Sequence, residues 1–169
     1  MKEIKTQEEL LQAIEHVHFA SLKLCKRYFG RYLPVSGNLE IFTHFDDEFA
    51  LLTQMRREIT NEEINWNQKY FLLKKPITIT DKRGDIPKTS YTYLYVRRPD
   101  KDKPQVGDVD LVLEKDEFEK LKNEVQEKKN INEVDSFYRP DLDMIVLSAQ
   151  DSDVLVLITT KYMSENVKI

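Results

Sequence analysis

An internal repeat is the sequence feature that most constrains how this 169-residue chain can fold. Residues 39–43 and 109–113 both alternate apolar and polar side chains, as a half-buried β-strand does. Each segment is followed by the same helix start, Asp-Glu-Phe, at 47–49 and at 116–118. The two copies superpose with one residue inserted in the first. The chain is therefore predicted to contain two diverged copies of one supersecondary unit.

The rest of each copy has the composition of β-strands. In both copies the helix is followed by three strand-like stretches, so each half reads strand, helix, strand, strand, strand. The corresponding stretches are 70–74 with 136–140, 76–80 with 142–147, and 91–97 with 154–160. We expect an α+β fold in which two βαβββ-type modules form a cupped sheet, mixed or antiparallel.

A long amphipathic helix is predicted before the first module. Thr6 and Glu9 have the spacing of a capping box, in which both side chains bind free amides at a helix start. Apolar residues recur every three to four positions as far as Phe29, and Gly30 ends the pattern. The apolar face is so wide that either the sheet or a second subunit must cover it. Cys25 lies on this face, which favours a core residue over a reactive nucleophile.

The length of the chain suits a single domain, residues 1–169. A polar stretch with two prolines separates the modules, because proline cannot join a central strand. The predicted parts are an N-terminal helix at 1–33, a first module at 34–98, a linker at 99–107 and a second module at 108–169.

Composition and charge argue against several classes of function. A net charge of −4 without a basic stripe gives no reason to bind nucleic acid. No apolar run is long enough to span a membrane, and charges interrupt the first residues where a secretory signal is apolar. The single cysteine suits a reducing compartment, so we expect a cytoplasmic protein that contacts no membrane. The four glycines stand apart, which excludes a glycine-rich phosphate loop.

The second module shows the most specific pattern in the chain. An alternating strand at 108–113 precedes a helix through Phe118 and Leu121, a strand at 142–147, and Gln-Asp-Ser-Asp at 150–153 before a last strand. In order and spacing this pattern resembles a module of the vicinal-oxygen-chelate superfamily, which includes glyoxalase, bleomycin-resistance proteins and extradiol dioxygenases. The resemblance implies two modules placed edge to edge around a cup, where metal ligands project from the first and last strands of each module.

The residues at the ligand positions that the resemblance implies depart from that family's set. Where the first strand often carries histidine, this chain has Asn38 and Asp108. Where the last strand usually carries glutamate, it has Tyr93 and Val156. Valine cannot bind a metal ion, and a lone tyrosine rarely does. The resemblance therefore favours a member without a metal ion, and we expect no cofactor.

Strand alternation sorts the candidate site residues by face. Leu39 and Ile41 should face a helix, whereas Glu40 should face the cup together with Asp108 and Asp110. Glu40 and Asp110 occupy equivalent positions in the repeat, and close carboxylates raise one another's pKa or share a cation. The alternative is that both acids are hydrated at an open sheet surface.

A stripe of tyrosines ending in arginine runs along the strand at 91–97. Its residues are Tyr91, Tyr93, Tyr95 and Arg97, which suit a small aromatic or carboxylate-bearing ligand. The alternative is a packing ladder across strands, with Arg97 paired to Asp110 for structural reasons alone. The candidate ligand-binding residues are therefore Glu40, Tyr93, Tyr95, Arg97 and Asp110.

Three functions remain open from the sequence, and whether the protein is an enzyme is undecided. The first is a metal-free protein that binds a small molecule in the cup. The second is a lyase, isomerase or dioxygenase of the same superfamily, with a divalent metal held by Glu40, His44, Asp108 and Asp110. The third is an interaction module that docks a partner or a second copy through the N-terminal helix. We expect a homodimer.

Overall fold

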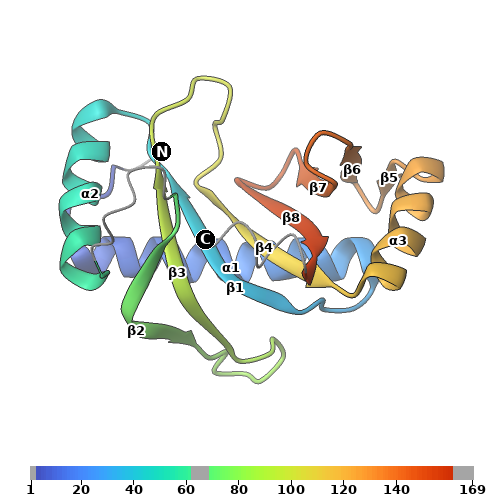
Figure 1. The fold of residues 1–169 in the computed structure, drawn as a ribbon, viewed down its shortest axis with the longest axis horizontal. Coiled ribbons are helices and arrows are strands. Elements are labelled where there is room, and N and C mark those ends of the chain that lie inside the picture. The colour runs from blue at the N-terminus through green and yellow to red at the C-terminus, as the bar shows by residue number, and fades with distance from the viewer. Residues whose placement is uncertain (1–2, 62–68, 162–169) are drawn as a thin grey trace.

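The computed structural model describes residues 3–61 and 69–161. Within these residues, three α-helices and one eight-stranded mixed sheet form a fold of the α+β class (Figure 1). The helices are α1 (Gln7–Phe29), α2 (Asp46–Ile59) and α3 (Lys115–Glu127). The strands are β1 (Val35–Phe42), β2 (Phe71–Ile79), β3 (Thr89–Arg97), β4 (Gly107–Leu113), β5 (Asn130–Ile131), β6 (Val134–Arg139), β7 (Met144–Ala149) and β8 (Val154–Thr160).

The sheet is organised around the antiparallel strands β1 and β4, a pair that we call the seam. The strand order is β2-β3-β1-β4-β8-β7-β6-β5. On one side of the seam β3 lies parallel to β1, and on the other side β8 lies parallel to β4. Leu39 pairs with Val109 across the seam, so Glu40 and Asp110 occupy equivalent places in the two halves. The predicted repeat is therefore confirmed at the centre of the sheet.

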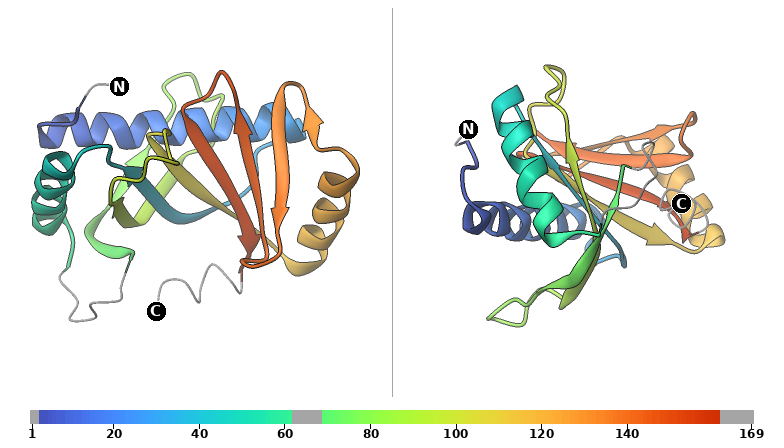
Figure 2. Two further views of the ribbon diagram at one scale, coloured as in Figure 1. Left: turned by 90° about the horizontal axis from the view of Figure 1, so that it is seen from above. Right: turned by 60° about the vertical axis from the view of Figure 1, so that its left-hand side comes forward.

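Helix α1 covers the face of the sheet that forms the main hydrophobic core (Figures 1 and 2). It begins at the predicted cap, where the Thr6 side chain accepts a hydrogen bond from the Glu9 amide at 3.1 Å. It ends at Gly30, which adopts a left-handed conformation. The helix contacts β1, β4, β6, β7 and β8, and its apolar residues, Leu10 and Cys25 among them, belong to the core. The sheet of the same chain therefore covers the apolar face of α1.

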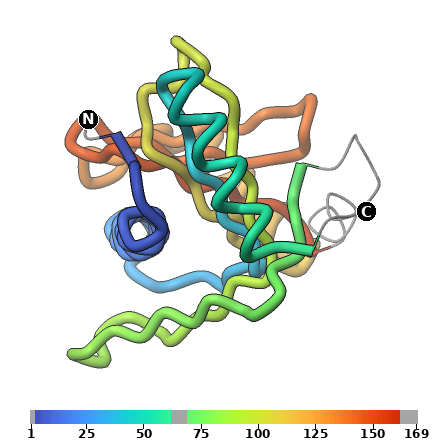
Figure 3. Tube along the Cα trace, turned by 90° about the vertical axis from the view of Figure 1, so that its left-hand side faces the viewer, coloured from blue at the N-terminus to red at the C-terminus, as the bar shows by residue number. Residues whose placement is uncertain are grey.

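Helices α2 and α3 follow β1 and β4, as the repeat predicts. Helix α2 contacts β2 and β3, whereas α3 contacts β6 and β8, so the two helices lie toward opposite ends of the sheet. Figure 3 looks along α1 and shows α2 steeply inclined to it. No helix in the described part of the chain combines the length and the apolar character that crossing a bilayer requires.

The outer strands of the first half differ from the prediction. Segments 70–74 and 76–80 form one strand, β2, rather than two. The pairing of β2 with β3 shifts between Leu72 and Ile77, and Pro76 lies within this irregular stretch. The second half has the three predicted strands, β6, β7 and β8, together with the short β5. The two halves are thus diverged copies, and the second is closer to the predicted pattern.

Candidate functional site

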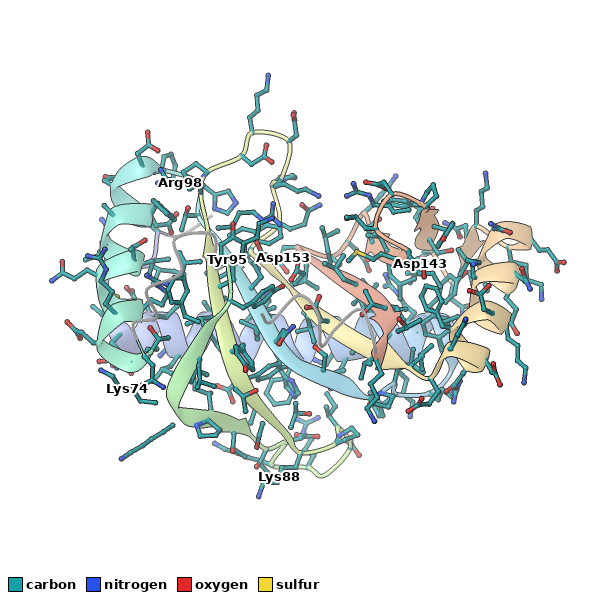
Figure 4. All side chains as sticks on the ribbon, in the orientation of Figure 1. Lys74, Lys88, Tyr95, Arg98, Asp143 and Asp153 are labelled. Atoms are coloured by element: carbon teal, nitrogen blue, oxygen red, sulfur yellow. The ribbon has the colours of Figure 1, made fainter. Side chains whose placement is uncertain are left out.

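A cavity of about 600 Å³ lies on the face of the sheet opposite the core under α1. Its strand residues alternate with core residues, as Glu40 does between Leu39 and Ile41. Both halves contribute, because β1, β3, β4, β6, β7 and β8 all supply lining residues. In Figure 4 side chains gather in front of these strands, where Tyr95 is labelled, while α1 passes behind them.

The polar residues gathered around the acids of β1 and β4, which we call the floor, are Glu40, Tyr70, Tyr95, Arg97, Asp108 and Asp110. Further charged residues line the cavity at exposed or partly exposed positions: Lys69, Asp102, Lys103 and Arg139. Glu40 pairs with Asp108 across the seam, so their side chains lie directly opposite each other on one face. Each of these two acids is only 2% exposed. Burying two carboxylates side by side costs free energy unless they are protonated or partnered.

Arg97 forms an ion pair with Glu40 on the floor. Its Nε and Nη2 groups donate to the two carboxylate oxygens of Glu40, the second at 3.3 Å. The ion-pair partner of Arg97 is thus Glu40, and not Asp110 as in the structural alternative drawn from the sequence. Because this guanidinium already binds a carboxylate of the protein, the structure does not support Arg97 as a receptor for a carboxylate-bearing ligand.

Asp110 accepts hydrogen bonds from two neutral donors. The Asn38 side-chain amide donates to Asp110 Oδ2 at 3.1 Å, and the Tyr70 hydroxyl donates to the same oxygen at 3.2 Å. The Tyr70 ring also lies against the Tyr95 ring, with 5.7 Å between centroids. Burial, and then the charge of Asp110, raise the pKa of Tyr70, so its hydroxyl keeps its proton.

Burial controls the protonation of the pair formed by Glu40 and Asp108. It raises the pKa of Glu40 to about 7, although Arg97 opposes this shift. The pKa of Asp108 is also raised, first by burial and then by the charges of Glu40 and Asp110. The two carboxyl groups lie within hydrogen-bonding reach, so a single shared proton removes their repulsion.

One oxygen of this pair has no donor among the residues that the structure describes. Asp108 Oδ1 is buried and makes no hydrogen bond to any described residue. Buried acceptors without a donor are costly and uncommon. The oxygen is thus available to the shared proton or to a group that enters the cavity.

An apolar part of the lining, which we call the wall, adjoins the floor, since Leu155 and Leu157 pair with Asp108 and Asp110. It consists of Phe42, Met144, Val146, Leu155 and Leu157. These residues come from β1, β7 and β8, so the wall also spans the seam. A few polar groups beside an apolar surface are typical of sites for amphipathic small molecules.

Most predicted site residues meet at this cavity, but two do not. Tyr93 pairs with Asn38 on the neighbouring strand and is not among the described residues that line the cavity. His44 lies apart from the floor, with its Nε2 at 3.1 Å from the backbone oxygen of Gln105 and its Nδ1 at 4.0 Å from Glu48. Glu40, Tyr95, Arg97, Asp108 and Asp110 do line the cavity.

The proposed four-residue metal site is not assembled, because His44 lies away from the three acids. Across residues 3–61 and 69–161, no three or more His, Cys, Asp or Glu side chains are arranged to hold a metal ion.

Tyr91 does not share the face of Tyr95, so the predicted tyrosine stripe is wrong at this residue. Tyr91 belongs to the hydrophobic core with Leu94, and its hydroxyl lies 2.8 Å from His18 Nδ1 of α1. Two partly buried residues, 92 and 93, separate these core residues, so strict alternation fails within β3. This break lies opposite the irregular stretch of β2 between Leu72 and Ile77.

The last-strand position in the second module is also shifted by one residue. Val156 pairs with Val109 and is fully buried in the core. Leu155, which pairs with Asp108, lines the cavity instead. Because successive side chains point to opposite faces, a slip of one residue moves a position from cavity to core. Leucine, like valine, offers no ligand atom to a metal ion.

Tyr70 is the floor residue that sequence patterns do not identify. It lies immediately before β2, outside any regular alternation, and reaches Asp110 through its hydroxyl. In the sequence, Tyr70 is only an aromatic residue at the start of a strand, which is a common feature of β-sheets.

No known protein-family profile matches the chain, and no curated protein sequence is significantly similar to it. A solved structure described as "Structural Genomics, Protein EC4020" is similar, with a TM-score of 0.63 and 12% sequence identity. The alignment covers 94% of this chain and 91% of that chain. At this identity the similarity concerns the fold alone.

Proposed function

We propose that the protein binds a small amphipathic molecule in the cavity that spans the seam. The observation that carries the proposal is the composition of the cavity of about 600 Å³, in which a polar floor with buried acids adjoins an apolar wall. Ligand sites of a few hundred Å³ commonly combine an apolar lining with a few well-placed polar groups. Four of the five candidate ligand-binding residues, Glu40, Tyr95, Arg97 and Asp110, belong to the floor.

We also propose that the chain is a diverged relative of the vicinal-oxygen-chelate superfamily. In the second half β4, α3, β6, β7 and β8 follow the order of that family's module, and β4 lies parallel to β8. The first half keeps β1, α2 and β3 in the same relation, with β2 in place of two strands. This strand order supports the proposal, and the binding function proposed above requires no metal ion.

The small molecule is the only partner that we propose. Docking through α1 has no support, because the apolar face of this helix is buried against its own sheet. For the compartment we propose the cytoplasm, where the free and buried Cys25 stays reduced.

Thermal-shift screening of the purified protein against small amphipathic molecules of different charge tests the binding function. We expect some compounds to raise Tm, because a ligand that binds only the folded state stabilises it. Leu157→Trp fills the cavity from the wall and should abolish these shifts. Leu11→Trp, on the exposed side of α1, is the matched control and should retain them. The proposal fails if no compound raises Tm, or if the shifts persist in Leu157→Trp.

A further inference from the structure

We infer that the floor of the cavity is a binding site for an organic cation, a primary ammonium or amidinium group held between Glu40 and Asp108. The inference rests on the proposed binding function and specifies the chemistry of the ligand. The apolar part of the ligand lies against the wall formed by β1, β7 and β8.

The charges of the floor favour a cation. On the floor, three buried acids, Glu40, Asp108 and Asp110, meet one guanidinium, that of Arg97, which is bound to Glu40. The other charged residues that line the cavity are exposed or partly exposed, where water screens their charges: Lys69, Asp102, Lys103 and Arg139. Asn38 and Tyr70, which donate to Asp110, are neutral and do not offset its charge. Excess negative charge is costly away from water. A ligand with a positive charge therefore stabilises the ionised floor.

The unpaired oxygen of Asp108 points to a missing donor. The other two acids of the floor accept hydrogen bonds from the protein. Asp108 Oδ1 accepts none from the described residues, although Asp108 is 2% exposed and lines the cavity. Its donor is either the proton shared with Glu40 or a group within the cavity. Ammonium and amidinium groups carry several N–H donors, enough to bind Glu40 and Asp108 together.

The cation takes the place of the proton that Glu40 and Asp108 share. On binding, the carboxyl pair releases this proton to solvent, and both acids bind the ligand as carboxylates. One positive charge leaves as a proton and one enters with the ligand, so the net charge of the site does not change. Because the proton and the cation compete, the affinity for the cation rises with pH until the pair is ionised in the free protein.

The wall favours an organic cation over a metal ion. Five apolar side chains adjoin the floor, and an apolar ligand body gains free energy by displacing water from them. A metal ion gains nothing from such a surface and prefers several anionic or imidazole ligands. In the described part of the chain, the acids of the floor do not provide such a set.

Isothermal titration calorimetry with matched probes tests the inference. Hexylamine, hexanol and hexanoate share an apolar chain and differ in the charge of the head group, and benzamidine and benzamide form a second matched pair. We expect the cations to bind roughly tenfold more tightly than the neutral probes, as charge-assisted hydrogen bonds exceed neutral ones. Their affinity should rise by up to about tenfold per pH unit below neutrality. Titrations in buffers of different ionisation enthalpy should show proton release on binding.

Asp108→Asn removes the charge while keeping the shape of the side chain. It should lower the affinity for hexylamine roughly 10- to 100-fold and leave hexanol binding unchanged. Asp151→Asn makes the same change in net charge away from the cavity, at an exposed acid bound to Arg27 of α1. This control should bind hexylamine as the wild type does.

The possible results separate this inference from the proposed function. Equal affinity for charged and neutral probes, or hexylamine binding that survives Asp108→Asn, overturns the cation site. The binding function stands in that case if Leu157→Trp still abolishes probe binding. If no probe binds, the compounds found by thermal shift test the inference instead. Hits that carry a cationic group support the cation site, and hits without one overturn it. A screen without any hit removes both proposals together.

Discussion

Glu40 of β1 lies directly opposite Asp108 of β4, and both side chains are buried on the cavity side of the sheet. The pair joins the two halves of the chain, since each half supplies one acid. Their proximity follows from the antiparallel register at the seam, so the raised pKa of each acid depends on the folding of both halves. The stability of the fold and the chemistry of the cavity are therefore coupled through these two side chains.

Asp108→Asn should make the protein more resistant to unfolding at alkaline pH. The folded-state pKa of Glu40 and of Asp108 lies above the unfolded value, so the unfolded state releases these protons first as pH rises. The stabilisation is full below about pH 4 and is lost as pH rises toward about 7, the pKa of Glu40. We expect the variant to gain about 1–3 kcal/mol at pH 8 relative to the wild type, and less at pH 5. Urea unfolding across this pH range measures the difference. Asp151→Asn should follow the wild-type pH dependence, and a curve for Asp108→Asn parallel to the wild type would count against the buried acid pair.

The wild-type protein should lose stability as pH falls from 6.5 toward 4, and His18→Gln should remove this loss. His18 is fully buried, with Nδ1 at 2.8 Å from the Tyr91 hydroxyl, and burial lowers its pKa to about 4. Its contribution is therefore present above the unfolded pKa of about 6.5 and is lost as pH falls toward 4. The loss amounts to about 2–3 kcal/mol by pH 4, and the glutamine variant, which cannot take up a proton, should not show it. The comparison is made by unfolding at pH 7 and at pH 4. The control is His16→Gln, an exposed histidine bound to Asp153, which should leave the acid-side loss in place. If both variants show the same pH dependence, His18 is not the source of the loss of stability at low pH.

Leu10→Ala and Leu11→Ala should differ sharply although the residues are neighbours. Leu10 is fully buried between α1 and the sheet, whereas Leu11 is 42% exposed. We expect Leu10→Ala to lower the free energy of unfolding by about 2–5 kcal/mol and Leu11→Ala by about 0.5 kcal/mol or less. Chemical denaturation followed by circular dichroism measures both. Similar small effects would mean that α1 contributes little to the core.

Gly107→Ala should disturb the seam itself. A Cβ atom at Gly107 would clash with the backbone oxygen of Glu40 and approach Val17 of α1 to 2.9 Å. Because backbone atoms cannot give way easily, we expect a loss of about 3 kcal/mol. Gly84→Ala is the matched control, since its Cβ meets no atom within 4 Å and only its positive φ of 76° is unfavourable, at about 1 kcal/mol. Thermal unfolding of both variants gives the comparison. A Gly107→Ala variant no less stable than Gly84→Ala would show that the strands at the seam can move apart.

Local patterns in the sequence determined the elements and the faces of the central strands. Thr6 and Glu9 predicted the start of α1, and the repeated Asp-Glu-Phe predicted α2 and α3. Alternation placed Glu40 and Asp110 on one face of the sheet, because side-chain direction in a regular strand depends only on neighbouring residues. These features need no information about the rest of the chain.

Tertiary structure alone decided which of these residues meet. The partnership of Arg97 with Glu40 follows from the parallel pairing of β3 with β1, and the contact of Tyr70 with Asp110 joins segments that are distant in sequence. Tyr91 enters the core where the pairing of β2 with β3 is irregular, and the register of β8 brings Leu155 rather than Val156 to the cavity. Strand register and bulges depend on how whole strands pair and pack, so a shift of a single residue, invisible in composition or periodicity, reverses the face that a side chain occupies.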